Sequence, residues 1–192
     1  MELVGNALCL DFTNTVNSRP HPARDELATA HGAVDWAQAV GLSLRSPPRA
    51  QVEEVLKQLR GLRETVFAVF SATAGGGEPP RAPLRRLVDA YSTALGNATW
   101  HRDSGTVVPE WSSIRRLPEL AWPVSASAMH LLTGGPLDRV RSCPSCGWLF
   151  LDVSKNGLRR WCSMATCGSR TKSARYFART KGHLHSGYRT GP

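Results

Sequence analysis

Four cysteines are the residues of this chain whose type and spacing most clearly predict chemistry. They form two close pairs, Cys143-x2-Cys146 and Cys162-x4-Cys167, with fifteen residues between the pairs. Each pair can hold two corners of a metal tetrahedron, and the loop between them brings the two pairs together. Four thiolates favour Zn²⁺, and a site with all four corners filled by protein is structural rather than catalytic.

The alternative interpretation, in which the four cysteines are simply buried or free thiols, is weaker. Four buried or free thiols would not need this spacing. His183 and His185 are either substitute metal ligands or solvated residues of the C-terminal tail. Cys9 stands between two leucines, so we expect it to be a small core residue rather than a reactive thiol.

Positive charge is concentrated in the same part of the chain as the four cysteines. The chain has 24 Lys and Arg residues against 15 Asp and Glu, a net charge of +9. Residues 1–140 hold fourteen of each kind, whereas residues 141–192 hold ten basic residues and one acid, Asp152. Four zinc-bound thiolates would leave this segment at about +7. The distribution predicts an acidic partner, such as double-stranded DNA, at the C-terminal end.

A basic helix is predicted just after the last cysteine, from about Ser169 to Lys181, with Ser169 as its N-cap and Gly182 at its end. Its apolar side, with Ala174, Phe177 and Ala178, is expected to pack on the preceding hairpin. The opposite side and the segment before it supply the predicted DNA contacts, which are Arg159, Arg160, Arg170, Lys172, Arg175, Tyr176 and Arg179. The alternative is a solvated basic face that only offsets the charge of the metal centre.

The elements around the cysteines predict a treble-clef-like zinc finger. Short strands at Arg139–Arg141 and Trp148–Leu151 flank a tight turn in which Gly147 can take a positive φ. About fifty residues bury little core alone, so a bound metal, worth about 10–16 kcal/mol in zinc peptides, would supply the missing stability.

The rest of the chain predicts a mainly α fold of the α+β kind. Apolar residues at helical spacing predict helices over about 29–40, 52–70 (opened by Pro47 and Pro48), 84–95 and 118–132. A glycine- and proline-rich linker covers 75–80, and a short hairpin is predicted within 98–114, turning at Asp103-Ser104-Gly105. The predicted domains are a helical domain at 1–136, the finger at 137–185 and a flexible tail at 186–192.

A polar cluster near the N-terminus is the other candidate site. Asp11, Asn14, Arg19 and His21 would either line a pocket for a small molecule or serve as local caps and turns. No nucleophile–base pair or carboxylate pair stands out, so we do not expect an enzyme.

The chain has the features of a cytoplasmic protein. Its first residues lack a basic start followed by an apolar run, and the longest apolar stretch, 120–132, is short and contains Pro123. Cysteines in metal spacing also fit a reducing compartment, so we expect neither secretion nor a membrane.

The segments 143–152 (CPSCGWLFLD) and 160–170 (RWCSMATCGSR) closely resemble the CGNR zinc finger of bacterial proteins. The segments 8–15 (LCLDFTNT) and 25–29 (DELAT) resemble the ABATE domain that accompanies this finger. The resemblance implies a stress-associated transcription regulator with a DNA-binding finger, in which the four cysteines bind zinc. A small-molecule effector in the N-terminal domain and a homodimer are further expectations. Ser169 stands where the signature has Asn, and both residues suit a helix start.

Overall fold

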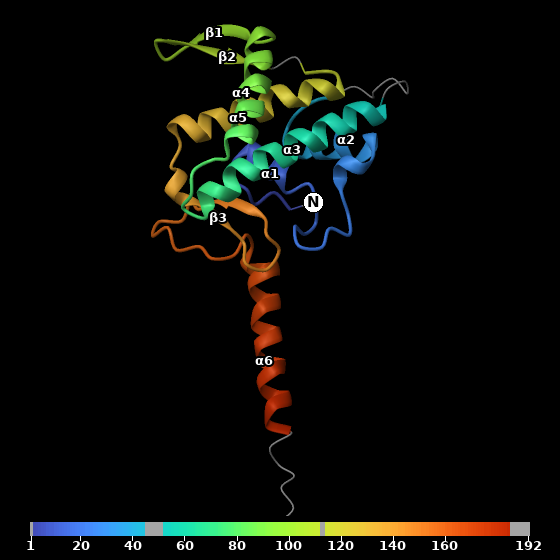
Figure 1. Ribbon diagram of the computed structural model, residues 1–192, viewed down its shortest axis with the longest axis vertical. Helices are drawn as coiled ribbons and strands as arrows, with labels where there is room; N and C mark the ends of the chain where they lie inside the picture. The colour runs from blue at the N-terminus through green and yellow to red at the C-terminus, as the bar shows by residue number, and fades with distance from the viewer. Residues whose placement is uncertain (1, 45–51, 112–113, 185–192) are drawn as a thin grey trace, which may run out of the picture.

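The computed structural model describes residues 2–44, 52–111 and 114–184, which form a helical body, two small hairpins and one projecting helix (Figure 1). The elements are, in order, α1 (Leu8–Thr13), η1 (Glu26–Ala28), α2 (Ala30–Ala39), α3 (Val52–Ala74), α4 (Arg81–Gly96), β1 (Thr99–Asp103), β2 (Thr106–Glu110), η2 (Leu117–Leu120), α5 (Ala121–Gly134), η3 (Leu137–Arg139), β3 (Val140–Ser142), β4 (Leu149–Leu151), η4 (Met164–Gly168) and α6 (Ser169–Leu184). The mainly α prediction is therefore confirmed.

The helices of the body lie where the sequence predicts, although some ends differ: α3 continues to Ala74 and α4 already begins at Arg81. Thr29 caps α2, because its hydroxyl accepts the N–H of Gly32 at 3.1 Å, and Gly41 follows the helix with a φ of +83°. α3 and α4 are separated by the predicted glycine- and proline-rich linker. Pro47 and Pro48 lie outside the described residues. No helix of the described ranges is long and apolar enough to cross a membrane.

Both hairpins are antiparallel. β1 pairs with β2 through a turn in which Ser104 and Gly105 have positive φ, as two-residue hairpin turns require. β3 pairs with β4, with Val140 opposite Leu151, and this second hairpin carries the first two cysteines at its turn.

The core of the body extends into the second hairpin. Val140 and Leu149 are fully buried in one apolar cluster with Leu10 of α1 and with Val69 and Phe70 of α3. A second cluster surrounds Trp36 and Phe12, whose rings lie 5.2 Å apart. The finger's hairpin is thus packed against α1 and α3 rather than standing alone.

The C-terminal helix differs from its prediction in three ways. α6 continues through Gly182 to Leu184, and it projects away from the body (Figure 1). Phe177 is 63% exposed, and Ala174 and Ala178 are exposed too, so the predicted packing on the hairpin is wrong. The physical reason is that the hairpin already buries its apolar side chains against α1 and α3.

The third difference concerns the start of the helix. Ser169 already has helical φ and ψ of −63° and −44°, so it is not the N-cap. The helical path begins one turn earlier, with the π-helical turn η4. Ser163 caps that turn, because its hydroxyl accepts the N–H of Thr166 at 3.3 Å.

Candidate metal centre

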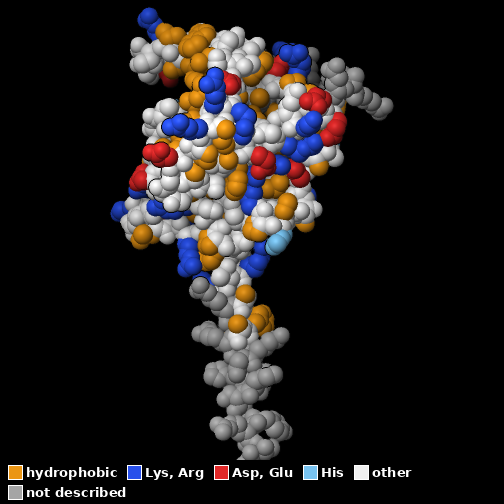
Figure 2. Space-filling model, in the orientation of Figure 1, with side chains coloured by type: hydrophobic (Ala, Val, Ile, Leu, Met, Phe, Trp, Pro, Cys, Tyr) orange, Lys and Arg blue, Asp and Glu red, His pale blue; other side chains and the backbone are white. Residues whose placement is uncertain are grey.

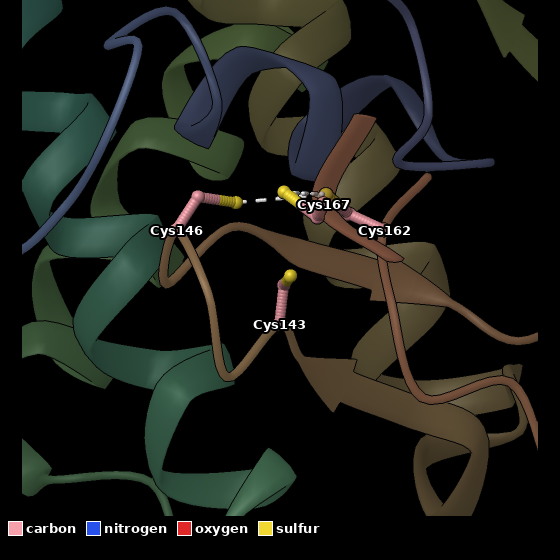
Figure 3. A group of neighbouring side chains, drawn as sticks. All are labelled: Cys143, Cys146, Cys162 and Cys167. Carbon is pink, nitrogen blue, oxygen red and sulfur yellow. Dashed lines mark hydrogen bonds between the residues drawn. The ribbon is translucent and has the colours of Figure 1, made fainter. Parts of the chain in front are cut away.

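The four cysteines predicted as ligands meet at one point. Cys143 and Cys146 border the turn between β3 and β4, and Cys167 lies in η4. The four sulfur atoms all lie within 4.8 Å of one another, and all four residues are buried. Figure 3 shows the four side chains pointing toward a common centre.

The distances between the sulfur atoms fit a tetrahedral zinc ion. The Sγ atom of Cys162 lies 3.5 Å from that of Cys146 and 3.6 Å from that of Cys167. Sulfur atoms bound at about 2.3 Å to a central Zn²⁺ are about 3.8 Å apart along the edges of the tetrahedron. Four thiolates also make a closed, soft donor set of the structural kind. The protein therefore has a site for one structural zinc ion.

The turn between the first two ligands has the geometry that the sequence predicts. Gly147 has a φ of +73°, and its N–H donates to the carbonyl of Cys143 at 2.8 Å. The Cys143 N–H donates in turn to the carbonyl of Trp148 at 2.8 Å. These bonds hold the backbone of the turn from which both thiolates project.

The close approach of the sulfur atoms shifts the pKa of three of the ligand thiols. Hydrogen bonds from Cys146 and Cys162 lower the pKa of Cys143, so one sulfur ionises readily. The hydrogen bond with Cys143 and burial then raise the pKa of Cys146 to about 12, and the pKa of Cys162 is raised for the same reasons. Metal binding must therefore release protons, and metal affinity must fall in acid.

Asp152, the single acid of the basic segment, holds both ends of the loop that leads to Cys162 through hydrogen bonds. Its carboxylate is fully buried and accepts the N–H of Ser154 at 2.9 Å and the N–H of Arg159 at 2.8 Å. Burial would raise the pKa of Asp152, but these hydrogen bonds and the charge of Arg139 hold it below its usual value. The isolated acid in the sequence was a signal for this role.

Arg159 holds the same loop with its side chain. Its Nε atom donates to the carbonyl of Trp161 at 3.0 Å, and its Nη2 atom donates to the carbonyl of Cys162. The guanidinium also lies 4.8 Å from the centre of the Phe150 ring. Arg159 therefore positions a metal ligand, and its predicted contact with DNA stays a prediction.

The N-terminal segment forms hydrogen bonds with the finger at Trp148 and Leu149. The buried Asn14 amide donates to the carbonyl of Leu149 at 2.8 Å and accepts the Leu149 N–H at 3.1 Å, so it continues the edge of β4. The indole N–H of Trp148 donates to the carbonyl of Val16 at 2.6 Å. Sequence reasoning missed these roles, because the partners lie more than 130 residues apart and nothing local marks them.

Arg19 connects the metal turn to α3. Its backbone N–H donates to the carbonyl of Cys146 at 2.8 Å. A Cβ atom added at position 147 would lie 2.7 Å from the Cβ of Arg19. Gly147 is therefore required for close packing as well as for its φ. The Arg19 guanidinium pairs with Glu64 at 2.6 Å and lies 3.8 Å from the centre of the Phe67 ring.

The predicted polar cluster near the N-terminus bonds mainly within the protein. The carboxylate of Asp11 accepts the N–H of Gly5 at 2.8 Å, and burial raises its pKa. Asn14 and Arg19 serve the finger, and His21 lies exposed in the following loop. None of the four predicted residues lines the cleft between α3 and α4 or the small cleft beside the metal ligands.

The predicted DNA contacts lie at the base and along the first turns of α6. Four of them are exposed: Arg160, Arg170, Lys172 and Tyr176. The guanidinium of Arg160 lies 5.0 Å from the centre of the Trp161 ring. The side chains of Arg175 and Arg179 lie outside the described part of the chain. Arg170 also lines a small cleft of about 150 Å³ beside the metal ligands.

The fold and the site define a zinc-finger protein with a helical N-terminal body. A family model for ABATE, described as "putative stress-induced transcription regulator", matches residues 6–135, and the CGNR zinc finger model matches residues 139–180. The chain therefore belongs to the ABATE family and carries a CGNR zinc finger. A comparison with curated proteins gives no significant match. Neither matched family is one of enzymes.

Proposed function

We propose that this protein is a zinc-dependent, DNA-binding transcription regulator that acts in the cytoplasm. The zinc ion fixes the finger, the basic helix α6 contacts double-stranded DNA, and the N-terminal body responds to an effector or mediates assembly. No catalytic step is part of the proposal.

The observation that carries the proposal is the position of α6. The helix begins two residues after the last metal ligand and projects from the body (Figure 1), so its sides are open to a partner. Lys and Arg side chains lie on both sides of its base in Figure 2. The segment from residue 141 onward has ten basic residues and one acid, and that acid, Asp152, is buried. A projecting cationic helix of this kind suits phosphate contacts and insertion in the major groove.

The proposed roles follow the exposure of Arg160, Arg170, Lys172 and Tyr176, and those of Arg175 and Arg179 rest on the sequence alone. Arg160 and Arg170 at the base of α6 would bind phosphates, and Lys172, Arg175 and Arg179 would bind phosphates or base edges. Tyr176, which is 59% exposed, would stack or donate a hydrogen bond. A single short helix gives limited affinity, so we propose a homodimer that reads two half-sites.

Alanine replacement of the helix cations tests the proposal. The triple variant Lys172→Ala, Arg175→Ala, Arg179→Ala should lose retention of double-stranded DNA in a gel shift while keeping its zinc. A matched control replaces Arg81, Arg85 and Arg102, which are exposed on the body, and should bind DNA like the wild type. Equal binding by both variants would contradict the proposal.

The second candidate is a protein-interaction module in which zinc holds a scaffold for an acidic protein partner. The exposed Phe177, whose ring lies 5.9 Å from that of Tyr176, favours this alternative, because DNA grooves do not require an exposed phenyl ring. Unchanged DNA retention by the triple variant would favour it over the regulator.

A further inference from the structure

A cleft between α3 and α4 is a feature of the described surface that the proposed function leaves unused. It has a volume of about 560 Å³, within the usual range of small-molecule sites. Its lining residues come from facing sides of the two helices: Gly61, Leu62, Glu64, Thr65, Arg86, Asp89 and Ala90. No side chain fills the space beside Gly61, where an added Cβ would meet nothing within 4 Å.

The α4 side of the cleft presents one cation and one anion. Arg86 and Asp89 lie one turn apart on α4 and are both exposed. Among the described residues neither forms an ion pair, and the Nε atom of Arg86 makes only a long hydrogen bond of 3.4 Å to Thr65. Acidic and basic side chains both appear over α3 and α4 in Figure 2. This arrangement complements a ligand that itself carries both charges.

The rest of the lining combines apolar and small residues with the polar Glu64 and Thr65. Leu62 and Ala90 border it, and Gly61 leaves room beside them. We propose that the cleft binds a free α-amino acid with a small apolar side chain. The ligand carboxylate binds Arg86, its ammonium group binds Asp89, and its side chain contacts Leu62 and Ala90.

The cleft is connected to the metal centre through two residues. Glu64, in the cleft wall, holds Arg19 with one carboxylate oxygen at 2.6 Å and Arg63 with the other at 2.8 Å. The backbone N–H of Arg19 in turn donates to the carbonyl of Cys146. The ligand ammonium group bound to Asp89 lies in the same cleft as Glu64, where its charge competes with Arg19 for the Glu64 carboxylate and so changes the packing of the metal turn. This coupling rests on the proposed function, whereas the binding site itself does not.

The test is a titration of the zinc-loaded, ¹⁵N-labelled chain followed by amide chemical shifts. The probes are L-leucine, L-valine, isovalerate (carboxylate only) and isoamylamine (ammonium only). We expect saturable shifts at Gly61, Thr65 and Ala90 with the two amino acids, and weaker binding of both single-charge probes. Arg86→Gln should weaken binding at least about tenfold, because it removes a charged hydrogen bond. The neighbouring Arg85→Gln, an exposed residue outside the cleft, is the matched control.

The outcomes separate the site from the regulator. Absence of saturable shifts with both amino acids, or equal weakening by Arg86→Gln and Arg85→Gln, overturns the binding site. Saturable binding that leaves the DNA affinity of the zinc-loaded chain unchanged overturns the coupling and supports the site alone. If the chain does not retain DNA at all, the proposed function fails while the titration still decides whether the cleft binds amino acids.

Discussion

Asn14 offers the sharpest test of how the helical body and the finger are joined. Replacing it by alanine removes the amide that both donates to and accepts from the backbone of Leu149. Asn14 is only 4% exposed, so water cannot easily replace these bonds. Each buried group left without a partner costs about 1–3 kcal/mol, and with partial relaxation we expect a loss of about 3 kcal/mol. For a chain of this size, that corresponds to a fall in Tm of about 6–12 °C.

The assay is thermal and urea unfolding of the zinc-loaded protein, together with the rate of zinc loss to a chelator. Asn97→Ala is the matched control, because the Asn97 amide makes one exposed hydrogen bond to the carbonyl of Thr93 and should change stability by about 0.5 kcal/mol or less. Asn14→Ala should also speed zinc loss, since β4 carries the metal turn. If the two variants have the same stability and the same zinc loss, the proposed attachment of the finger to the body is refuted.

Three further predictions concern the thiols, the ligand loop and pH. In the zinc-loaded protein a thiol reagent should react slowly, chelation should free the four ligand thiols, and Cys9, whose pKa is raised to about 12 by burial, should react only on unfolding; early reaction of Cys9 would contradict its placement. Arg159→Ala should speed zinc loss with little direct effect on DNA contacts, whereas Arg160→Ala should weaken DNA binding and keep zinc; the reverse pattern would refute these assignments. Burial alone would raise the pKa of Glu119, but hydrogen bonds from Arg115 and Arg116 lower it, so its stabilising effect is complete above the ordinary glutamate pKa and is lost as the pH falls through the lowered value. The stability difference between the wild type and Glu119→Gln should therefore shrink below about pH 4.5, and a difference that grows in acid would contradict the assignment.

The sequence predicts the parts of this protein that depend on local spacing. The ligand set follows from two short cysteine intervals, and α2, α3 and α4 follow from apolar periodicity and from caps such as Thr29. The positive φ of Gly147 also follows from its place in the turn. Each of these features is decided by residues only a few positions apart.

The remaining features depend on contacts between distant segments. Asn14 bonds to Leu149 across 135 positions, and no periodicity marks such a pair. The amphipathic pattern of α6 suggested that Phe177 packs on the hairpin, but the apolar side chains of that hairpin are already buried against α1 and α3. The contacts of Arg159 with the carbonyls of Trp161 and Cys162 were missed, because charge alone does not reveal which backbone groups a guanidinium binds. The cleft between α3 and α4 has no signature in the sequence either, because it forms only where the two helices pack together.

The central claim is that a zinc-fixed cationic helix binds DNA through its charges. The most direct measurement is the affinity for double-stranded DNA over a series of salt concentrations, made with zinc-loaded protein and again after chelation. About five phosphate contacts predict a slope of about −4.5 for log K against log salt. Chelation should abolish this binding. Binding that is independent of salt, or that is undiminished after the metal is removed, would contradict the account.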